Sequence, residues 1–244
     1  MSPEHKALLD QLHAASRPAD SRFDPAAYLK SGAAFINVAV PEQRRIAKAW
    51  LKAHRDWATP DVLRLVDELV QGASHEEKTL GLHLLEGLGK GLRPFGPAEA
   101  DRWLDHLVGW AEVDTLCQST FGSEDLLADW SAWSSFIRRL ARDPNLNKRR
   151  AALVLLCRPT RTSPDPGLRD LAFEMVEALK SHREIIITKA VSWLLRSLSE
   201  QHPAQVSRYL DTDGPTLPAI AVRETRAKLA TGRKTNRLVP SAQS

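Results

Sequence analysis

The sequence predicts an all-α fold made of successive helical repeats, and three observations carry this prediction. Apolar residues recur at helical spacing along most of the 244 residues, as in Val62, Leu65, Val66 and Leu69. Prolines and glycines interrupt this pattern at short intervals, which predicts roughly a dozen helices joined by short turns. The sequence has no Asn-Gly hairpin flanked by alternating apolar residues, the strongest local signal for β-structure.

The individual elements follow from the same pattern. Thr59 and Pro60 predict a helix start at residues 59–61, with Thr59 as the capping residue and the proline in the first turn. Further helices are expected around residues 80–88, 151–156, 171–179 and 185–198. The β-branched run at residues 185–187 lies inside a helix-length apolar pattern, so it is assigned to a helix. The best loop is predicted at residues 159–167.

The spacing of the helix pairs favours a solenoid. Pairs recur about every 40 residues, which is the period of HEAT-like repeats. A helical bundle is the competing architecture, but the sequence has no long heptad set, and its short pairs need neighbours to bury their apolar faces. We therefore expect a HEAT-like superhelix as a single domain over residues 1–238, with a flexible C-terminal tail at 239–244.

Composition excludes several classes of protein. The chain is 43% hydrophobic and 26% charged, which is typical of a globular protein. Cys117 and Cys157 lie in apolar surroundings and are too few for a disulfide framework, which predicts a reducing compartment. No apolar run is long enough to span a bilayer, and residues 1–12 lack the apolar core of an export signal.

The positive charge is concentrated near the C-terminus. Residues 219–244 carry a net charge of +5, whereas the whole chain carries +4, so the rest is close to neutral. Such a cluster suits nucleic acid, but basic tails also serve as solubilising ends. Charge alone leaves these two interpretations even.

Familiar catalytic motifs are absent. The sequence has no phosphate-cradling glycine loop, no paired-cysteine zinc spacing and no His-Glu-x-x-His helix. The stretch at residues 87–91 is glycine-rich but follows a helix, so it is interpreted as a flexible helix end. The eight histidines are scattered singly, which favours surface or helix-end roles over a metal centre. We expect neither metal nor cofactor.

Four local patterns combine aromatic and charged residues. Trp110 and Asp114 are four residues apart, hence on one helix face. Residues 148–150 place three cations at the start of an apolar helix, where the helix dipole opposes them. Trp193 lies between two cations, and Tyr28 lies upstream of the basic helix start at residues 40–45. Taken singly, each has a structural explanation: core tryptophan, surface carboxylate, cation paired with a neighbouring helix, or packed tyrosine.

Together these patterns resemble the AlkD family of bacterial DNA alkylation repair glycosylases, from about Tyr28 to the basic tail. Trp110-x-x-x-Asp114 matches the family's tryptophan–aspartate segment. Arg150, followed by Ala-Ala and apolar residues, matches its arginine segment. Trp193, in Lys-Ala-Val-Ser-Trp-Leu-Leu-Arg, is close to the family's Lys-Ala-Ile-Gly-Trp-x-Leu-Arg pattern. Tyr28 keeps the family's offset to the Pro-Glu-Gln-Arg-Arg segment.

The resemblance implies a monofunctional enzyme that hydrolyses the N-glycosidic bond of cationic N3- and N7-alkylpurines, such as 3-methyladenine and 7-methylguanine. It implies HEAT-like repeats with a concave basic face that grips the DNA backbone without base flipping. Asp114 then stabilises the oxocarbenium-like sugar and orients water. Trp110 and Trp193 add cation–π stabilisation, and Arg150 clamps a phosphate beside the lesion.

The implied partner is double-stranded DNA containing alkylated purines, bound by a cytoplasmic bacterial monomer that is nucleoid-associated when on DNA and has no membrane contact. The residues expected to follow the backbone are Tyr28, Arg44, Arg45, Lys148, Arg149, Lys189, Arg196, Arg223, Arg226, Lys228, Arg233 and Lys234.

Two departures from the family suggest a preference for bulkier adducts, as in self-resistance to a DNA-alkylating natural product. Gly109 stands where the family often carries a second aromatic residue, and Ala39 where some relatives have a polar one. The alternatives are a non-catalytic DNA-binding relative and, more distantly, a protein-interaction solenoid. The persistence of Asp114, Trp110, Arg150 and Trp193 favours the enzyme.

Overall fold

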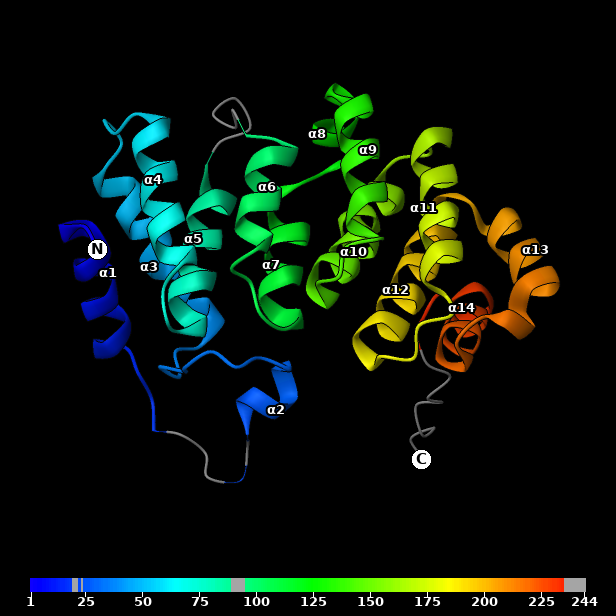
Figure 1. The fold of residues 1–244 in the computed structure, drawn as a ribbon, viewed down its shortest axis with the longest axis horizontal. Coiled ribbons are helices and arrows are strands. Elements are labelled where there is room, and N and C mark those ends of the chain that lie inside the picture. Colours follow the sequence, from blue (N-terminus) through cyan, green and yellow to red (C-terminus); the bar gives the residue numbers. More distant parts are fainter. Residues whose placement is uncertain (19–21, 23, 89–94, 235–244) are drawn as a thin grey trace, which may run out of the picture. The chain divides into compact units, whose positions relative to one another are not determined.

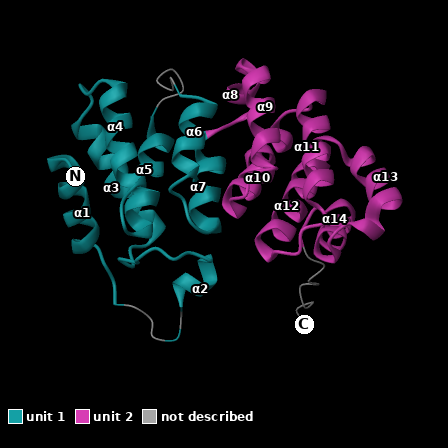
Figure 2. Ribbon diagram, in the orientation of Figure 1, with its two compact units in different colours: residues 1–120 teal, residues 121–244 magenta. Residues whose placement is uncertain are grey.

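The structure, a computed structural model, describes residues 1–18, 22, 24–88 and 95–234. In this part of the chain it has fourteen α-helices and no strand, which confirms the all-α helical-repeat class (Figure 1). The one β-type pairing among these residues is an isolated bridge between Ala34 and Ser74. The chain divides into two compact units, residues 1–120 and 121–244 (Figure 2). The predicted single domain over 1–238 stays a prediction.

Unit 1 is organised around helix α5. Its helices are α1 (Pro3–Ala14), α2 (Pro25–Leu29), α3 (Val40–Ala53), α4 (Thr59–Val70), α5 (His75–Gly87), α6 (Pro97–Leu104) and α7 (Trp110–Thr120). Helix α5 packs against α3, α4 and α7, so that α3, α5 and α7 follow one another as a layer. Proline lies in the first turn of α1, α2, α3, α4 and α6, where its missing N–H costs no helical hydrogen bond.

Unit 2 repeats this arrangement around helix α12. Its helices are α8 (Ser123–Ala128), α9 (Trp130–Leu140), α10 (Leu146–Thr162), α11 (Pro166–Leu179), α12 (Ile185–Gln201), α13 (Pro203–Asp213) and α14 (Ala219–Thr231), with a 3₁₀ turn at Gly214–Thr216. Helix α12 packs against α10 and α14, while α11 and α13 cover it from outside this layer. Alternate helices thus form one layer in each unit.

Most predicted helices are confirmed, including the first turn of α12 at residues 185–187. The predicted cap at Thr59 is wrong by one residue. Ala58 is the capping residue and makes no side-chain hydrogen bond, and Thr59 is the first helical residue.

The loop predicted at 159–167 is confirmed only at residues 163–165, so its predicted bounds are too wide. Pro159 lies inside α10, which continues to Thr162, and Pro166 opens α11. A proline inside a helix removes one hydrogen bond and crowds the carbonyl four residues before it, but α10 packs against α11 and α12, which stabilises the helix beyond Pro159.

Residues 219–231 of the basic C-terminal segment form α14, with Ala221 and Thr225 fully buried. The predicted flexible tail at 239–244 and residues 89–91 of the glycine-rich stretch lie outside the described residues. Cys117 and Cys157 are buried thiols, as expected of core residues. None of the described helices is long and apolar enough to cross a membrane.

The expected histidine placement is wrong for His83, which is buried inside α5 with its Nδ1 atom 3.0 Å from a carboxylate oxygen of Glu86. His5 and His75 are buried as well and pair with Glu77 and Glu112. The partners of His5 and His75 lie on other helices, and spacing along the chain cannot reveal such pairs, whereas the partner of His83 lies three residues away on α5 itself. The described residues contain no cluster of side chains suited to a metal ion.

Candidate functional site

The candidate residues gather on one layer of helices within each unit. In unit 1 they lie on α3 and α7, apart from Tyr28 on α2. In unit 2 they lie on α10, α12 and α14, apart from Arg233 and Lys234, which follow α14. Helices α3 and α7 both pack on α5 in unit 1, and α10 and α14 both pack on α12 in unit 2. The residues chosen from the sequence therefore occupy equivalent helices of the repeat.

Trp110 and Tyr28 form a joined aromatic pair in unit 1. The indole Nε1–H of Trp110 donates a 2.9 Å hydrogen bond to the backbone carbonyl of Tyr28. The two rings meet edge to face, with centroids 5.4 Å apart and planes at 79°. Tyr28 is 58% exposed and Trp110 half-buried. The pair thus presents aromatic surface to solvent, and the hydrogen bond and ring contact fix the two side chains relative to each other.

Asp114 lies one helical turn after Trp110 on α7 and is half-buried. The two side chains therefore share a face of the helix, as the sequence predicted. A carboxylate at this place can stabilise a positive charge that meets the aromatic pair.

The backbone explains why residue 109 is a glycine. Its φ is +86°, in the region that favours glycine, and a Cβ there would lie 2.4 Å from the backbone oxygen of Leu29. The absence of a side chain thus lets the end of α2 approach the start of α7. It does not by itself indicate a widened cleft.

The two arginines of α3 are exposed but bound to acids. Arg44 lies 3.2 Å from Glu86 of α5, and Arg45 makes hydrogen bonds to both carboxylate oxygens of Glu42 on its own helix. Such surface pairs are weak, so these cations remain available to exchange partners.

The three cations at the start of α10 are more buried than the sequence suggested. Lys148 is 6% exposed and Arg150 is 5% exposed. Arg150 donates to the backbone carbonyl of Ile186 in the first turn of α12, and Arg149 donates to the carbonyls of Asp143 and Pro144. Arg149 and Arg150 thus stabilise carbonyl groups, which accounts for cations at an otherwise unfavourable helix end.

Helix α12 carries a stripe of Lys189, Trp193 and Arg196, spaced along one face. Lys189 is exposed and Trp193 half-buried. Arg196 approaches Glu224 of α14 to 3.5 Å, and that buried carboxylate also accepts a 2.6 Å hydrogen bond from Ser192. Burial lowers the pKa of Arg196, and Glu224 opposes this effect. Arg196 therefore links α12 to α14.

The cations of the C-terminal segment differ in their surroundings. Lys228 lies 2.6 Å from Glu200, Arg226 lies 3.6 Å from Asp211, and Lys234 lies 3.4 Å from Glu224. Arg223 and Arg233 are exposed. The predicted basic surface is thus interleaved with acids.

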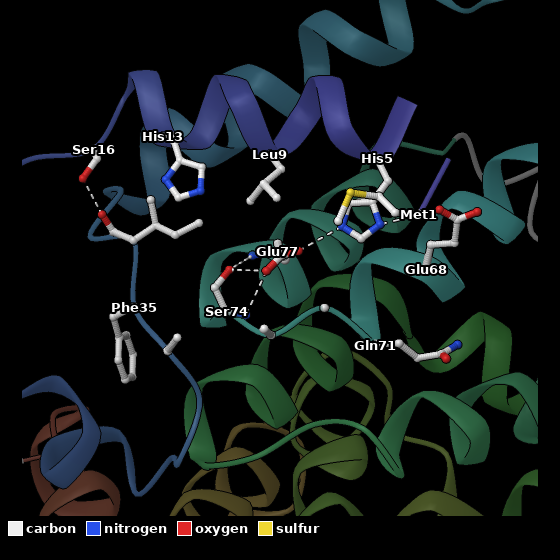
Figure 3. A pocket seen from close by; sticks show the side chains of 14 residues that line it. Met1, His5, Leu9, His13, Ser16, Phe35, Glu68, Gln71, Ser74 and Glu77 are labelled. Atoms are coloured by element: carbon white, nitrogen blue, oxygen red, sulfur yellow. Dashed lines mark hydrogen bonds and ion pairs between the residues drawn. The ribbon is translucent and has the colours of Figure 1, made fainter. Parts of the chain in front are cut away.

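A pocket of about 840 Å³ opens elsewhere in unit 1 (Figure 3). His5, from α1, lies in its wall with Nε2 2.9 Å from a carboxylate oxygen of Glu77. Burial raises the pKa of Glu77, but hydrogen bonds from Ser74 and His5 outweigh it and hold the pKa below its ordinary value. None of the predicted site residues lines this pocket.

Sequence reasoning missed the residues that hold α7. His75, Lys78 and Glu112 are buried and polar, and they bind the start of α7 and the turn before it. The available signal was the run His-Glu-Glu-Lys at the start of an otherwise apolar helix. Four consecutive polar residues include positions that must face inward on any helix.

Fold and side chains define an all-α helical-repeat protein whose alternate helices carry aromatic, acidic and basic residues. The sequence profile of the DNA alkylation repair enzymes matches residues 8–229, which is most of the chain. The chain therefore belongs to this family, and its role is enzymatic repair of alkylated DNA.

The fold is similar to that of a protein described as a predicted DNA alkylation repair enzyme from Enterococcus faecalis. The TM-score is 0.68 at 19% identity, over 94% of this chain and 97% of that one. At this identity the similarity concerns the fold alone. The comparison with curated proteins gives no match.

Proposed function

We propose that this enzyme is a DNA glycosylase that hydrolyses the N-glycosidic bond of cationic N3- and N7-alkylpurines in duplex DNA, without flipping the base. The observation that carries the proposal is the arrangement on α7, where Asp114 lies one turn from Trp110 and Trp110 is joined to Tyr28. Family membership supplies the substrate class of alkylated DNA.

The chemistry suits these residue types. An N3- or N7-alkylpurine already carries a positive charge, so it departs as a neutral base when it takes the electron pair of the C1′–N bond. Water then forms the new bond to C1′ and releases its proton to solvent. Asp114 would stabilise the positive charge that develops on the sugar and orient the water. No lysine or amine nucleophile is required, so the enzyme would be monofunctional.

The remaining roles are those that the resemblance to the family implies. Trp110 and Trp193 would stabilise cationic substrate through their ring faces, more strongly as charge develops. Arg150 would hold a phosphate beside the lesion from a guanidinium whose position the Ile186 carbonyl helps to fix. Exposed cations such as Lys189 and Arg223 would contact the phosphates along the DNA backbone. The enzyme would act as a monomer bound to one duplex.

We further propose a preference for bulky adducts, which is the most specific part of the proposed function. Its support is Ala39, a small residue at the start of α3, because Gly109 is explained by the approach of Leu29. Comparing release of a bulky N3-adduct with release of methylpurines tests this point separately.

The main experiment measures free 3-methyladenine and 7-methylguanine from methylated duplex DNA by mass spectrometry. We expect release by the wild type, with DNA strands left unbroken until alkali is added. Asp114→Asn should lower the rate constant about 10²- to 10³-fold, because it removes one electrostatic stabiliser. Asp170→Asn, an exposed aspartate paired with Arg169 on α11, is the matched control and should keep the wild-type rate.

Two outcomes would contradict the proposal. If DNA binds but no cationic lesion releases a base, the chain is a non-catalytic DNA-binding member. If Asp114→Asn retains the wild-type rate, the carboxylate has another role and the assignment to α7 is wrong.

A further inference from the structure

The first turn of α5 contains four consecutive buried polar residues. His75, Glu76, Glu77 and Lys78 are 9%, 3%, 5% and 7% exposed, respectively. Buried polar groups are costly unless they are hydrogen-bonded. Each of these side chains makes its hydrogen bonds with a different segment of unit 1.

Glu76 binds the segment that precedes α3, and Glu77 binds α1 and the cap of α5. The carboxylate of Glu76 accepts hydrogen bonds from the backbone N–H groups of Ile36, Asn37 and Val38, at 2.8, 2.8 and 3.3 Å. Glu77 accepts from Ser74 at the cap of α5 and pairs with His5 of α1 (Figure 3). These two acids therefore organise the N-terminal part of the unit.

Lys78 binds the backbone around the turn between α6 and α7. Its ammonium donates to the carbonyl of His106 at 2.9 Å and to the carbonyl of Val70 at 2.8 Å. Burial lowers the pKa of Lys78, and the nearby carboxylates of Glu112 and Glu77 oppose this shift. This residue ties the end of α4 to the turn that precedes α7.

His75 binds α7 itself through Glu112. Its Nδ1 atom lies 2.9 Å from one carboxylate oxygen of Glu112, a residue with 0% exposure. The other carboxylate oxygen accepts a 2.7 Å hydrogen bond from the N–H of Val108. Glu112 is thus held between α5 and the residue two positions before Trp110.

The held turn leads directly into the candidate site. Gly109 follows Val108 and lies against the backbone of Leu29, and Trp110 then donates to the carbonyl of Tyr28. Asp114 follows one turn later on the same helix. Any rotation or shift at the start of α7 would move Trp110 and Asp114 together.

We propose that His75, acting through Glu112, is a positioning residue for the proposed glycosylase reaction, because it fixes the start of α7 and with it Trp110 and Asp114. The inference rests on the proposed function for its catalytic consequence. Its structural part is independent of that function and can be measured without substrate. Displacing a catalytic group by about 1 Å costs about 10²-fold in rate, so small shifts of α7 are measurable.

The test compares three variants. His75→Leu removes the contact with Glu112. His75→Asn keeps a polar nitrogen at the same number of bonds from the backbone and should restore it. Glu77→Gln is the matched control, since it perturbs the same buried turn without contacting α7. All three are assayed below their unfolding temperatures, with full-length protein and methylated duplex DNA.

We expect His75→Leu to lower the single-turnover rate constant roughly 10- to 100-fold, with little change in DNA affinity. His75→Asn should recover most of the rate, and Glu77→Gln should keep it even where its Tm falls. The indole N–H signal of Trp110 in ¹H–¹⁵N NMR spectra, assigned with Trp110→Phe, should shift and exchange faster in His75→Leu only.

The outcomes separate the two proposals. If the wild type releases no base, the proposed function fails, and the indole signal alone decides the positioning role. If the wild type is active but folded His75→Leu keeps both the rate and the indole signal, the positioning role is wrong. If the rate falls equally in His75→Leu and Glu77→Gln, in step with Tm, the turn contributes only stability and the inference is likewise overturned.

Discussion

Helix α7 of unit 1 and the basic helices of unit 2 are held in place by different kinds of residue. At α7 the buried residues His75 and Glu112 hold the helix, which leaves Trp110 beside the exposed Tyr28. In unit 2 the candidate site cations themselves bind neighbouring helices. Arg150 binds the carbonyl of Ile186, and Arg196 pairs with Glu224 between α12 and α14.

The difference shows that a cation in a motif need not be a free ligand for phosphate. A guanidinium that stabilises a buried carbonyl contributes to the fold whether or not DNA is present. An exposed lysine such as Lys189 contributes little to the stability of the fold, so its role can be limited to DNA binding. Mutations separate these two roles, because one changes stability and the other changes the dependence of binding on salt.

Arg150→Ala should produce the largest loss of stability. Removing a hydrogen bond from a charged donor, together with the packing of a buried side chain, is expected to lower the free energy of unfolding by about 3 kcal/mol. Chemical denaturation measures this change, and Lys189→Ala is the control, with a loss near zero. An Arg150→Ala protein that is fully stable but binds DNA weakly would place Arg150 with the exposed cations.

Gly109→Ala should have the next largest effect. The positive φ and the 2.4 Å approach of a new Cβ to the Leu29 oxygen are expected to cost about 2 kcal/mol in total. Gly232→Ala is the matched control: φ there is +69°, but nothing lies within 4 Å of the added Cβ, so only the backbone strain of about 1 kcal/mol remains. Equal losses in the two variants would mean that α2 does not depend on its contact with Gly109.

Local sequence was sufficient for the helices and for the shared face of Trp110 and Asp114, because helical periodicity is a short-range property. It was insufficient for partners that lie far along the chain. Arg150 binds a carbonyl 36 residues away, and His75 pairs with an acid 37 residues away. The structural role of Gly109 was missed for the same reason, since its constraint comes from Leu29 on another helix. Tertiary packing decides which polar residues are buried, and no spacing rule contains that information.

The smallest expected effect concerns two lysines of unit 2 and sharpens the comparison between exposed and paired cations. Lys189 is exposed, whereas Lys228 is half-buried, 2.6 Å from Glu200 and bonded to the carbonyl of Gly232. If Lys189 contacts a phosphate, Lys189→Ala should weaken DNA binding and reduce the slope of log K against log salt by about 0.9. Lys228→Ala should change this slope less, because Lys228 must leave Glu200 before it can neutralise a phosphate. Affinity measured by fluorescence anisotropy at several salt concentrations gives both slopes. Equal slopes for the two variants would mean that pairing with an acid does not keep a cation from DNA, and the distinction between the two kinds of cation would fail.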